Sequence, residues 1–326
     1  MKNKINCSII GLGRIGTLLE QDKKREKPAT HAGAIHHNRD CQLLSGCDIE
    51  EEQRRLFQQT WKCPHIFSNY LELLDFKIPD ILHIATPPQA HFEICREAII
   101  RGVPVVICEK PFTLSINEAR EIESLVKKSS TKIIINHERR YSRDYNDVKK
   151  IIDSKHFGAL LNISAKLCMG YSRAPRDLLW HDGTHMVDIL RFLVDQELEF
   201  RYFYGDLDKK TSSCDIGFMA GSIPVHLLAA TDRKYLMFEM DLFFEQALIR
   251  IGNGVFEILK SKPSPFYDSY FSLISSQNRR YKTTGYFSNM MKEAVELSKV
   301  ENLHTTPRSN VNDGVKSIEI IKSLLL

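Results

Sequence analysis

The feature that most constrains the fold is a short apolar run that leads directly into a glycine motif. Residues 5–10 read INCSII, and residues 11–16 read GLGRIG. When such a motif follows a strand and opens a helix, its first glycine allows a tight turn and its second lets the backbone approach a pyrophosphate. The third glycine lets helix and strand pack closely, and the first N–H groups of the helix hold the phosphates. A glycine-rich turn in another α/β protein is the alternative. The predicted dinucleotide contacts within the motif are Gly11, Gly13, Arg14, Ile15 and Gly16.

An acidic residue at the end of the second strand separates these two interpretations. Residues 42–48 are strand-like and end in Asp48, whose carboxylate would accept hydrogen bonds from the adenosine ribose hydroxyls. Three glutamates follow at positions 50–52, and the first arginine is Arg54. Because a 2′-phosphate would be repelled by these carboxylates, we predict NAD as the cofactor in preference to NADP.

The distance from the glycine motif to Asp48 exceeds the usual spacing of about 20 residues. The excess lies in residues 20–28, which are highly charged and end in Pro28, and Thr30 is placed to cap a resumed helix. We interpret this insertion as a solvated surface loop. The alternative is that its basic residues, with His31, border the ligand site and contact an anionic substrate.

Two further apolar strands end in residues that could contact a cofactor or substrate. Residues 79–85 lead into TPPQAH, whose prolines stop the strand and start a helix over 90–101. Ligands of open α/β sheets bind at this carboxyl edge. We therefore expect cofactor contacts from Thr86, Pro87 and His91.

Lys110 stands between the end of the strand over 103–108 and a proline that restricts its backbone. A cation fixed at this edge can hold a substrate hydroxyl or carbonyl oxygen. Glu109 is either its structural partner or a contact to the cofactor ribose. A sixth strand, over 131–136, leads into Arg139 and Arg140.

The stretch LWHDGTH, residues 179–185, places His181, Asp182 and His185 at the start of a helix. His181 and His185 are four residues apart, so in an α-helix they would share one face. This pattern fits an acid–base group, a metal site, or a polar helix start. Because no further cluster of strong metal ligands accompanies it, we predict no metal.

Composition limits the remaining possibilities. The chain has 326 residues, 26% of them charged, and a net charge of +4 with the basic residues dispersed, which does not favour a nucleic-acid-binding protein. No apolar run is long enough for a membrane span, and the first residues lack the pattern of a signal peptide. Eight scattered cysteines without a CxxC motif fit reduced core residues. We expect a cytoplasmic protein.

Together these motifs resemble the glucose–fructose oxidoreductase / inositol dehydrogenase (Gfo/Idh/MocA) family of NAD(P)-dependent sugar oxidoreductases. The matching elements are GLGRIG, the strand-end Asp48, ATPPQAH, CEKP and the arginine pair after the sixth strand. The resemblance implies an α/β fold: a doubly wound parallel Rossmann sheet in residues 1–136, then an α+β domain with a large, mostly antiparallel open sheet in 137–326. Six strand-like runs between 159 and 251 indicate such a sheet independently. A last helix over about 312–325 would pack on the first domain, and the second sheet would join copies into a homodimer or homotetramer.

The resemblance also implies an activity, hydride transfer between NAD and a hydroxyl or carbonyl group of a sugar, inositol or sugar nucleotide. Lys110 would stabilise the developing alkoxide. For the proton carrier we rank His185 first, His181 second and Lys110 third. The family usually has DxGxH here, but His181 stands where its Asp would be, so either His181 or Asp182 takes over that role. The predicted substrate contacts are Lys110, Arg140, Tyr171, His181 and His185. The alternatives are a non-catalytic NAD- and metabolite-sensing regulator on the same fold, and a reductase of a non-sugar carbonyl or a tetrapyrrole.

Overall fold

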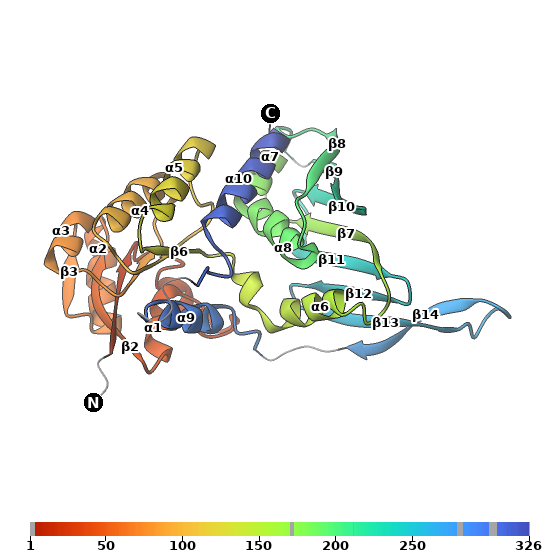
Figure 1. Cartoon of the computed structure of the whole chain (residues 1–326), viewed down its shortest axis with the longest axis horizontal. Coiled ribbons are helices and arrows are strands. Elements are labelled where there is room, and N and C mark those ends of the chain that lie inside the picture. Colours follow the sequence, from red (N-terminus) through yellow and green to blue (C-terminus); the bar gives the residue numbers. More distant parts are fainter. Residues whose placement is uncertain (1–3, 170–172, 211, 279–282, 300–304, 326) are drawn as a thin grey trace. The chain divides into compact units, whose positions relative to one another are not determined.

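The computed structural model describes residues 4–169, 173–210, 212–278, 283–299 and 305–325. These residues form two compact units (Figure 1), and the boundary between them falls inside the last helix. Unit 1 comprises Met1–Tyr141 and Thr283–Ile318, and unit 2 comprises Ser142–Lys282 and Glu319–Leu326. Each unit has its own sheet and its own apolar core.

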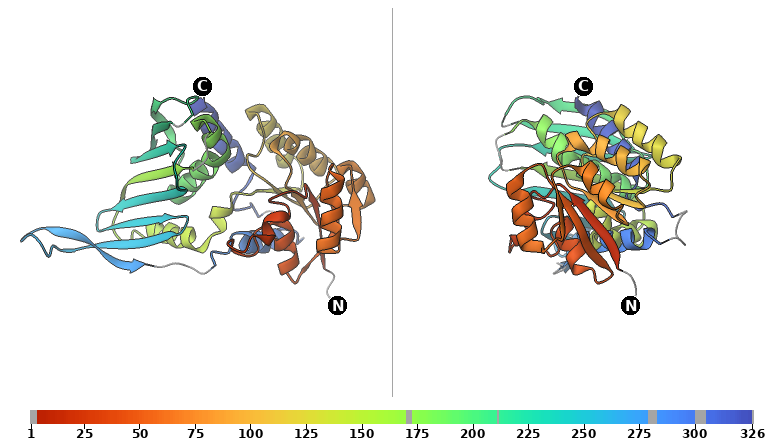
Figure 2. Two further views of the ribbon diagram at one scale, coloured as in Figure 1. Left: turned by 180° about the vertical axis from the view of Figure 1, so that it is seen from behind. Right: turned by 90° about the vertical axis from the view of Figure 1, so that its left-hand side faces the viewer.

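Unit 1 is built on a six-stranded parallel sheet with the strand order β3-β2-β1-β4-β5-β6. Helices α4 and α5 lie on one face of this sheet, and α1 and α9 lie on the other (Figures 1 and 2). The strands are β1 (Ile5–Ile10), β2 (Cys41–Cys47), β3 (His65–Phe67), β4 (Ile81–Ile84), β5 (Val105–Cys108) and β6 (Lys132–Ile135). The helices are η1 (Leu18–Gln21), α1 (His31–His37), α2 (Glu51–Trp61), α3 (Tyr70–Phe76), η2 (Pro88–Ala90), α4 (His91–Ile100), α5 (Ile116–Lys127), η3 (Glu138–Tyr141) and α9 (Tyr286–Leu297).

Strands β4, β5 and β6 are apolar at most positions because helices cover both faces of the sheet. Every residue of the three strands is buried, and His83 in β4 and Lys132 in β6 are their polar members. The strand order reverses between β1 and β4, and open α/β sheets bind ligands at the carboxyl ends of the strands beside such a reversal. A ligand site is therefore expected at the carboxyl ends of β1, β2, β4, β5 and β6.

Unit 2 is built on an eight-stranded sheet with the order β14-β13-β12-β11-β7-β10-β9-β8. The pair β7 and β10 is parallel, and the other neighbours are antiparallel. The strands are β7 (Leu160–Cys168), β8 (Glu199–Gly205), β9 (Ser213–Ala220), β10 (Ile223–Ala230), β11 (Met237–Phe244), β12 (Ala247–Gly252), β13 (Val255–Pro263) and β14 (Phe271–Asn278). The helices are α6 (Arg143–Asp153), α7 (Pro175–Leu178), the π-helical turn η4 (Leu179–Gly183), α8 (Thr184–Val194) and the end of α10 (Val311–Leu325).

The helices of unit 2 gather on one face of its sheet (Figure 1), and the strands alternate accordingly. In β7, Ile163, Ala165 and Leu167 are buried in the core against the helices, whereas the residues between them are half-buried on the other face. This period of two is the pattern of a sheet that is covered by helices on one face only.

The fold class predicted from the sequence is confirmed, and several boundaries agree closely. The strand over 5–10 matches residue for residue, and the predicted helix starts at His31 after Thr30, whose side chain accepts a hydrogen bond from Gly33 N. The pattern gave no indication of β3, β13, β14 or α9. The structure also differs from the predicted division at residue 136, because Thr283–Ile318, with α9 and the first part of α10, lies in unit 1.

The eight cysteines are all free and buried, as expected of reduced core residues. Within the described part of the chain, no helix combines the length and the apolarity needed to cross a bilayer.

Candidate functional site

The three glycines of the motif meet different surroundings in unit 1. Gly11 has a φ of +92°, and a Cβ there would lie 2.5 Å from the backbone of Ala85. A Cβ at Gly16 would lie 2.2 Å from Gly11 O. In contrast, a Cβ at Gly13 would meet no atom within 4 Å. The outer two glycines are thus required by the fold, whereas Gly13 leaves open space beside the backbone, which fits a pyrophosphate approaching the loop.

Asp48 follows β2 and faces the glycine loop. Its Oδ2 accepts a hydrogen bond from Leu12 N at 2.7 Å, and its Oδ1 accepts one from Glu50 N at 3.0 Å. Arg54 donates to the carbonyl oxygens of Asp48 and Ile49, at 2.8 Å each. The carboxylate is therefore held in place by backbone groups, and each of its oxygens retains a second lone pair for a ribose hydroxyl.

The insertion separates the turn after the glycine loop from α1, and backbone hydrogen bonds join the two across it. In a regular helix Ile15 O would accept from residue 19, but it accepts from His31 N at 3.2 Å, and Gly16 O accepts from Ala32 N at 2.9 Å. Twelve residues (31 − 19) are thus looped out. Gly16 and Asp48 are 32 residues apart (48 − 16), and removing those twelve leaves 20, the usual spacing. We call residues 19–30 the excursion.

Charged side chains of the excursion bind groups of unit 1. Glu20 accepts from Ala29 N and Thr30 Oγ1, both at 2.8 Å, and Lys27 donates to carbonyl oxygens of its own loop. Glu26 accepts from Thr284 N, Thr284 Oγ1 and Gly285 N at the start of α9. His31 is wholly buried. The hypothesis that His31 borders a ligand site is therefore wrong, and the excursion is a structural element.

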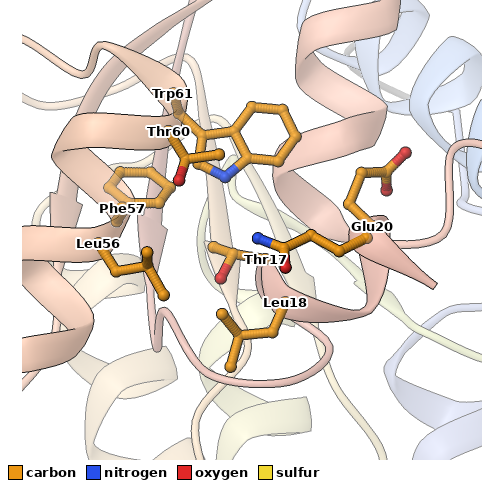
Figure 3. Close-up of a pocket in the computed structure, with 8 residues that line it drawn as sticks. Thr17, Leu18, Glu20, Leu56, Phe57, Thr60 and Trp61 are labelled. Atoms are coloured by element: carbon orange, nitrogen blue, oxygen red, sulfur yellow. The ribbon is translucent and has the colours of Figure 1, made fainter.

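A cavity of about 130 Å³ lies between the excursion and α2. Figure 3 shows Leu56, Phe57, Thr60 and Trp61 of α2 on one side and Thr17, Leu18 and Glu20 on the other. Gln21 completes the lining. Because these residues come from helices rather than from strand ends, we do not assign the cavity to a dinucleotide.

At the end of β4, His91 joins two loops. Its Nε2 lies 2.9 Å from Thr86 O, and its Nδ1 lies 3.0 Å from Pro111 O. Burial lowers the pKa of the imidazole below its ordinary value, although these carbonyl oxygens and Glu109 act in the opposite direction. The hydroxyl oxygen of Thr86 is buried and has no hydrogen-bond partner among the described residues. Thr86 thus offers a polar group to a ligand, whereas both ring nitrogens of His91 face the backbone.

At the end of β5, Glu109 is surrounded by donors. His31 Nε2 lies 3.0 Å from Glu109 Oε1, Asn136 Nδ2 lies 2.5 Å from the same oxygen, and Lys110 N donates to Oε2 at 3.2 Å. Burial alone would raise the pKa of Glu109. The hydrogen bonds from His31 and Asn136, with the charge of Lys110, outweigh burial and hold the pKa below its ordinary value. Glu109 is therefore a buried anion next to Lys110.

Arg140 is part of the buried framework of unit 1. Its Nη1 donates to Arg308 O and its Nη2 donates to Asp313 Oδ1, both at 2.8 Å. The guanidinium thus ties the segment after β6 to the start of α10. A Cβ at Gly314 would lie 3.0 Å from a carbon of Ile135 and from one of Phe112, so a side chain larger than glycine would be crowded there.

In unit 2 the stretch LWHDG forms a single π-helical turn before α8. The prediction that His181 and His185 share one face stays a prediction, because residues four apart are also close to one full turn in a π-helix. His181 is exposed and His185 is buried. Asp182 is half-buried in an ion pair with Arg173. Tyr171, a predicted substrate contact, lies outside the described residues.

The sequence analysis missed a second carboxylate on this helix. Asp188 is 1% exposed and lies three residues after His185 within α8. Residues at this spacing are neighbours on an α-helix, so Asp188 and His185 lie on one face of α8. In the described ranges, no group of three or more His, Cys, Asp or Glu side chains is placed to hold a metal ion.

Known proteins share these features. Residues 5–137 match the model of the oxidoreductase family with an NAD-binding Rossmann fold, GFO_IDH_MocA. Residues 5–137 thus resemble the Gfo/Idh/MocA oxidoreductase family. The matched residues contain the glycine loop, Asp48, Thr86, Glu109 and Lys110, so the family resemblance inferred from the motifs is confirmed.

Two curated family relatives come from Bacillus subtilis (strain 168). The uncharacterized oxidoreductase YrbE is 25% identical over 67% of this chain and 62% of that protein. The scyllo-inositol 2-dehydrogenase (NAD(+)) is 24% identical over 64% of this chain and 63% of that protein. The matched segment thus spans less than two thirds of either relative.

Solved structures share the fold over nearly the whole chain. The dehydrogenase from Chromobacterium violaceum has a TM-score of 0.78 and 17% identity, and the match covers 99% of this chain and 95% of that chain.

Proposed function

We propose that this chain is an NAD-dependent oxidoreductase that transfers a hydride between nicotinamide and a hydroxyl or carbonyl group of a cyclitol, sugar or sugar nucleotide. The observation that carries the proposal is the glycine loop, which is packed tightly at Gly11 and Gly16 and open at Gly13. The match of residues 5–137 to an oxidoreductase family with an NAD-binding Rossmann fold supports it. The name of the scyllo-inositol 2-dehydrogenase relative favours cyclitols within the substrate class.

The residues at the strand ends fit the dinucleotide. Backbone N–H groups of Gly13, Arg14 and Ile15 would hold the pyrophosphate, and Asp48 would accept from the adenosine ribose. Asp48 and the acidic start of α2 favour NAD over NADP, since a 2′-phosphate would lie among carboxylates. Thr86 and the adjacent Pro87 would border the nicotinamide half. We now assign His91 to positioning the loops and Arg140 to the framework, because their polar groups bind protein atoms.

The chain's own residues would move the proton and stabilise charge. When bound, nicotinamide accepts or donates the hydride. Lys110 would hold the substrate oxygen and stabilise its negative charge. His185 would take the hydroxyl proton, since histidine changes charge near neutral pH. We rank His181 and Asp182 below His185 as proton carriers, because His181 is exposed and Asp182 is paired with Arg173.

We also retain two proposals about the whole protein. The face of the unit 2 sheet that carries no helix would join copies into a homodimer or homotetramer, and exposed Tyr204 and Leu228, which both pair with Asp215, support this. Eight free, buried cysteines support a reducing compartment such as the cytoplasm.

A panel of cyclitols and sugars, followed at the nicotinamide absorbance, tests the function. We expect NAD reduction with a cyclitol, and its loss in both Lys110→Ala and His185→Ala while NADH fluorescence titration still shows binding. Turnover that survives both substitutions would refute the residue assignment. Tight NADH binding without turnover of any substrate by the wild type would instead favour a metabolite-sensing regulator.

A further inference from the structure

A buried chain of polar side chains runs beneath the carboxyl ends of β4, β5 and β6. His83 Nδ1 lies 2.9 Å from His31 Nδ1, His31 Nε2 lies 3.0 Å from Glu109 Oε1, and Asn136 donates to the same oxygen. His31, His83 and Asn136 are all 0% exposed. We call these four residues, His83, His31, Glu109 and Asn136, the relay. Apolar side chains would fill such positions at lower energetic cost, so a buried polar chain needs a reason.

The donors and acceptors of the relay can be assigned from its geometry. Glu109 is acceptor-only, so His31 Nε2 carries a proton and donates it. Burial, and then the neighbouring His31, hold the pKa of His83 well below its ordinary value, so His83 is neutral. Its Nε2 has no partner within the described part of the chain. A buried N–H without a partner is rarer than a buried lone pair, so the proton of His83 belongs on Nδ1. All donors then point towards Glu109.

The excursion is what delivers His31 to this place. The excursion ends where α1 begins, at His31, whose backbone N–H binds Ile15 O in the turn after the glycine loop. Thr30 caps the resumed helix, and Phe287 of α9 packs edge-on against the imidazole at 5.4 Å. The imidazole is thus fixed from both sides.

The relay ends at the proposed reacting lysine. Glu109 Oε1 accepts the hydrogen bond from His31 Nε2, and Glu109 Oε2 accepts one from Lys110 N at 3.2 Å. In the strand order β3-β2-β1-β4-β5-β6, Asp48 lies in the half that would hold adenosine, so the ends of β4, β5 and β6 form the nicotinamide half. His91, the other buried histidine near Glu109, contacts loop carbonyl oxygens instead.

We propose that His31, oriented by His83, is a positioning residue that fixes the Glu109 carboxylate, and through it the backbone and ammonium group of Lys110, for hydride transfer. This inference rests on the proposed function. It gives His31 and His83 a role in that function, although neither side chain would touch cofactor or substrate. His31 selects the orientation of Glu109, and Glu109 supplies the fixed negative charge beside Lys110.

A pair of isosteric variants tests the proposal. The amide of glutamine reaches the position of Nε2 and keeps a donor to Glu109, whereas the shorter amide of asparagine reaches only the position of Nδ1. We expect kcat of His31→Asn to fall by about ten- to a hundredfold, the range for losing a hydrogen bond to a charged group, and that of His31→Gln to stay within about threefold. The Kd for NADH should change less than about twofold in both variants, because the glycine loop and Asp48, which would hold the dinucleotide, are unchanged. His36→Asn, an exposed histidine of the same helix, is the control.

A second readout needs neither cofactor nor substrate. Carbon NMR of the Glu109 carboxyl group in the apoprotein should show its pKa raised by about one unit in His31→Asn and unchanged in His31→Gln. Equal kcat per folded molecule in both variants, or an unchanged Glu109 titration in His31→Asn, would overturn the proposal. If the wild type turns over no substrate, the proposed function fails, and the titration still decides whether His31 controls Glu109.

Discussion

Replacing Gly13 with alanine should abolish tight cofactor binding without harming the fold. A Cβ at Gly13 meets no atom within 4 Å, and its φ lies outside the left-handed region. Gly→Ala at a compatible position typically stabilises a protein by about 0.4–1 kcal/mol, since the unfolded chain loses freedom. The apoprotein should therefore be as stable as the wild type or slightly more stable.

The loss of affinity follows from the same open space. A pyrophosphate oxygen bound to the loop would sit within about 3 Å of a backbone nitrogen, and an added methyl group would displace it. Losing one hydrogen bond to a charged group costs about 1.5–3 kcal/mol. The Kd for NADH should thus rise by about ten- to a hundredfold.

Fluorescence titration with NADH and urea unfolding of the apoprotein measure the two effects separately. Gly16→Ala is the matched control, because its Cβ would lie 2.2 Å from Gly11 O and should destabilise the fold by about 1–3 kcal/mol. Unchanged NADH affinity in a stably folded Gly13→Ala would refute the assignment of the loop.

Three further predictions concern stability. Glu26→Gln removes the carboxylate that accepts from Thr284 N and Gly285 N at the start of α9. Thermal unfolding should show that the free energy of unfolding falls by about 1 kcal/mol, while NADH binding stays unchanged. An unchanged melting temperature would contradict the role of Glu26 at this helix start. Arg140→Met removes the guanidinium that pairs with the buried Asp313 carboxylate, which should cost about 3–5 kcal/mol in urea unfolding. A second substitution, Asp313→Leu, should restore part of this loss, and additive losses would contradict the pair. His83 has a pKa well below 6.5 when folded, so the unfolded state binds a proton first and stability falls as the pH drops below about 6.5. His83→Phe should remove up to about 1.4 kcal/mol per pH unit from that slope, and equal slopes in both proteins would count against a neutral, buried His83.

Much of unit 1 could be predicted because its signals are local. A strand that ends in GLGRIG and a strand that ends in Asp48 each specify a turn by their own residues. The long spacing between them was visible in the sequence. Its cause, a loop between the glycine turn and α1, depends on hydrogen bonds to Ile15 and Gly16 that no local pattern encodes.

The relay could not be predicted, because residues 31, 83, 109 and 136 are brought together only by the parallel sheet. One signal was available: His83 stands in the otherwise apolar strand ILHI, where an unpaired polar side chain would be costly. The π-turn at LWHDG was missed because sequence patterns assume the α-helical period. Strands β13 and β14 were missed because many of their side chains are exposed and the alternation that marks a half-buried strand is weak.

Transfer of deuterium from NADH that carries deuterium at both C4 positions of the nicotinamide tests the central claim most directly. The wild-type protein would be incubated with labelled NADH and a panel of keto-cyclitols and keto-sugars, and the products weighed by mass spectrometry. We predict an alcohol that carries one deuterium on the carbon of the former carbonyl group, and none with Lys110→Ala. Bound NADH with no deuterium in any product would contradict the account.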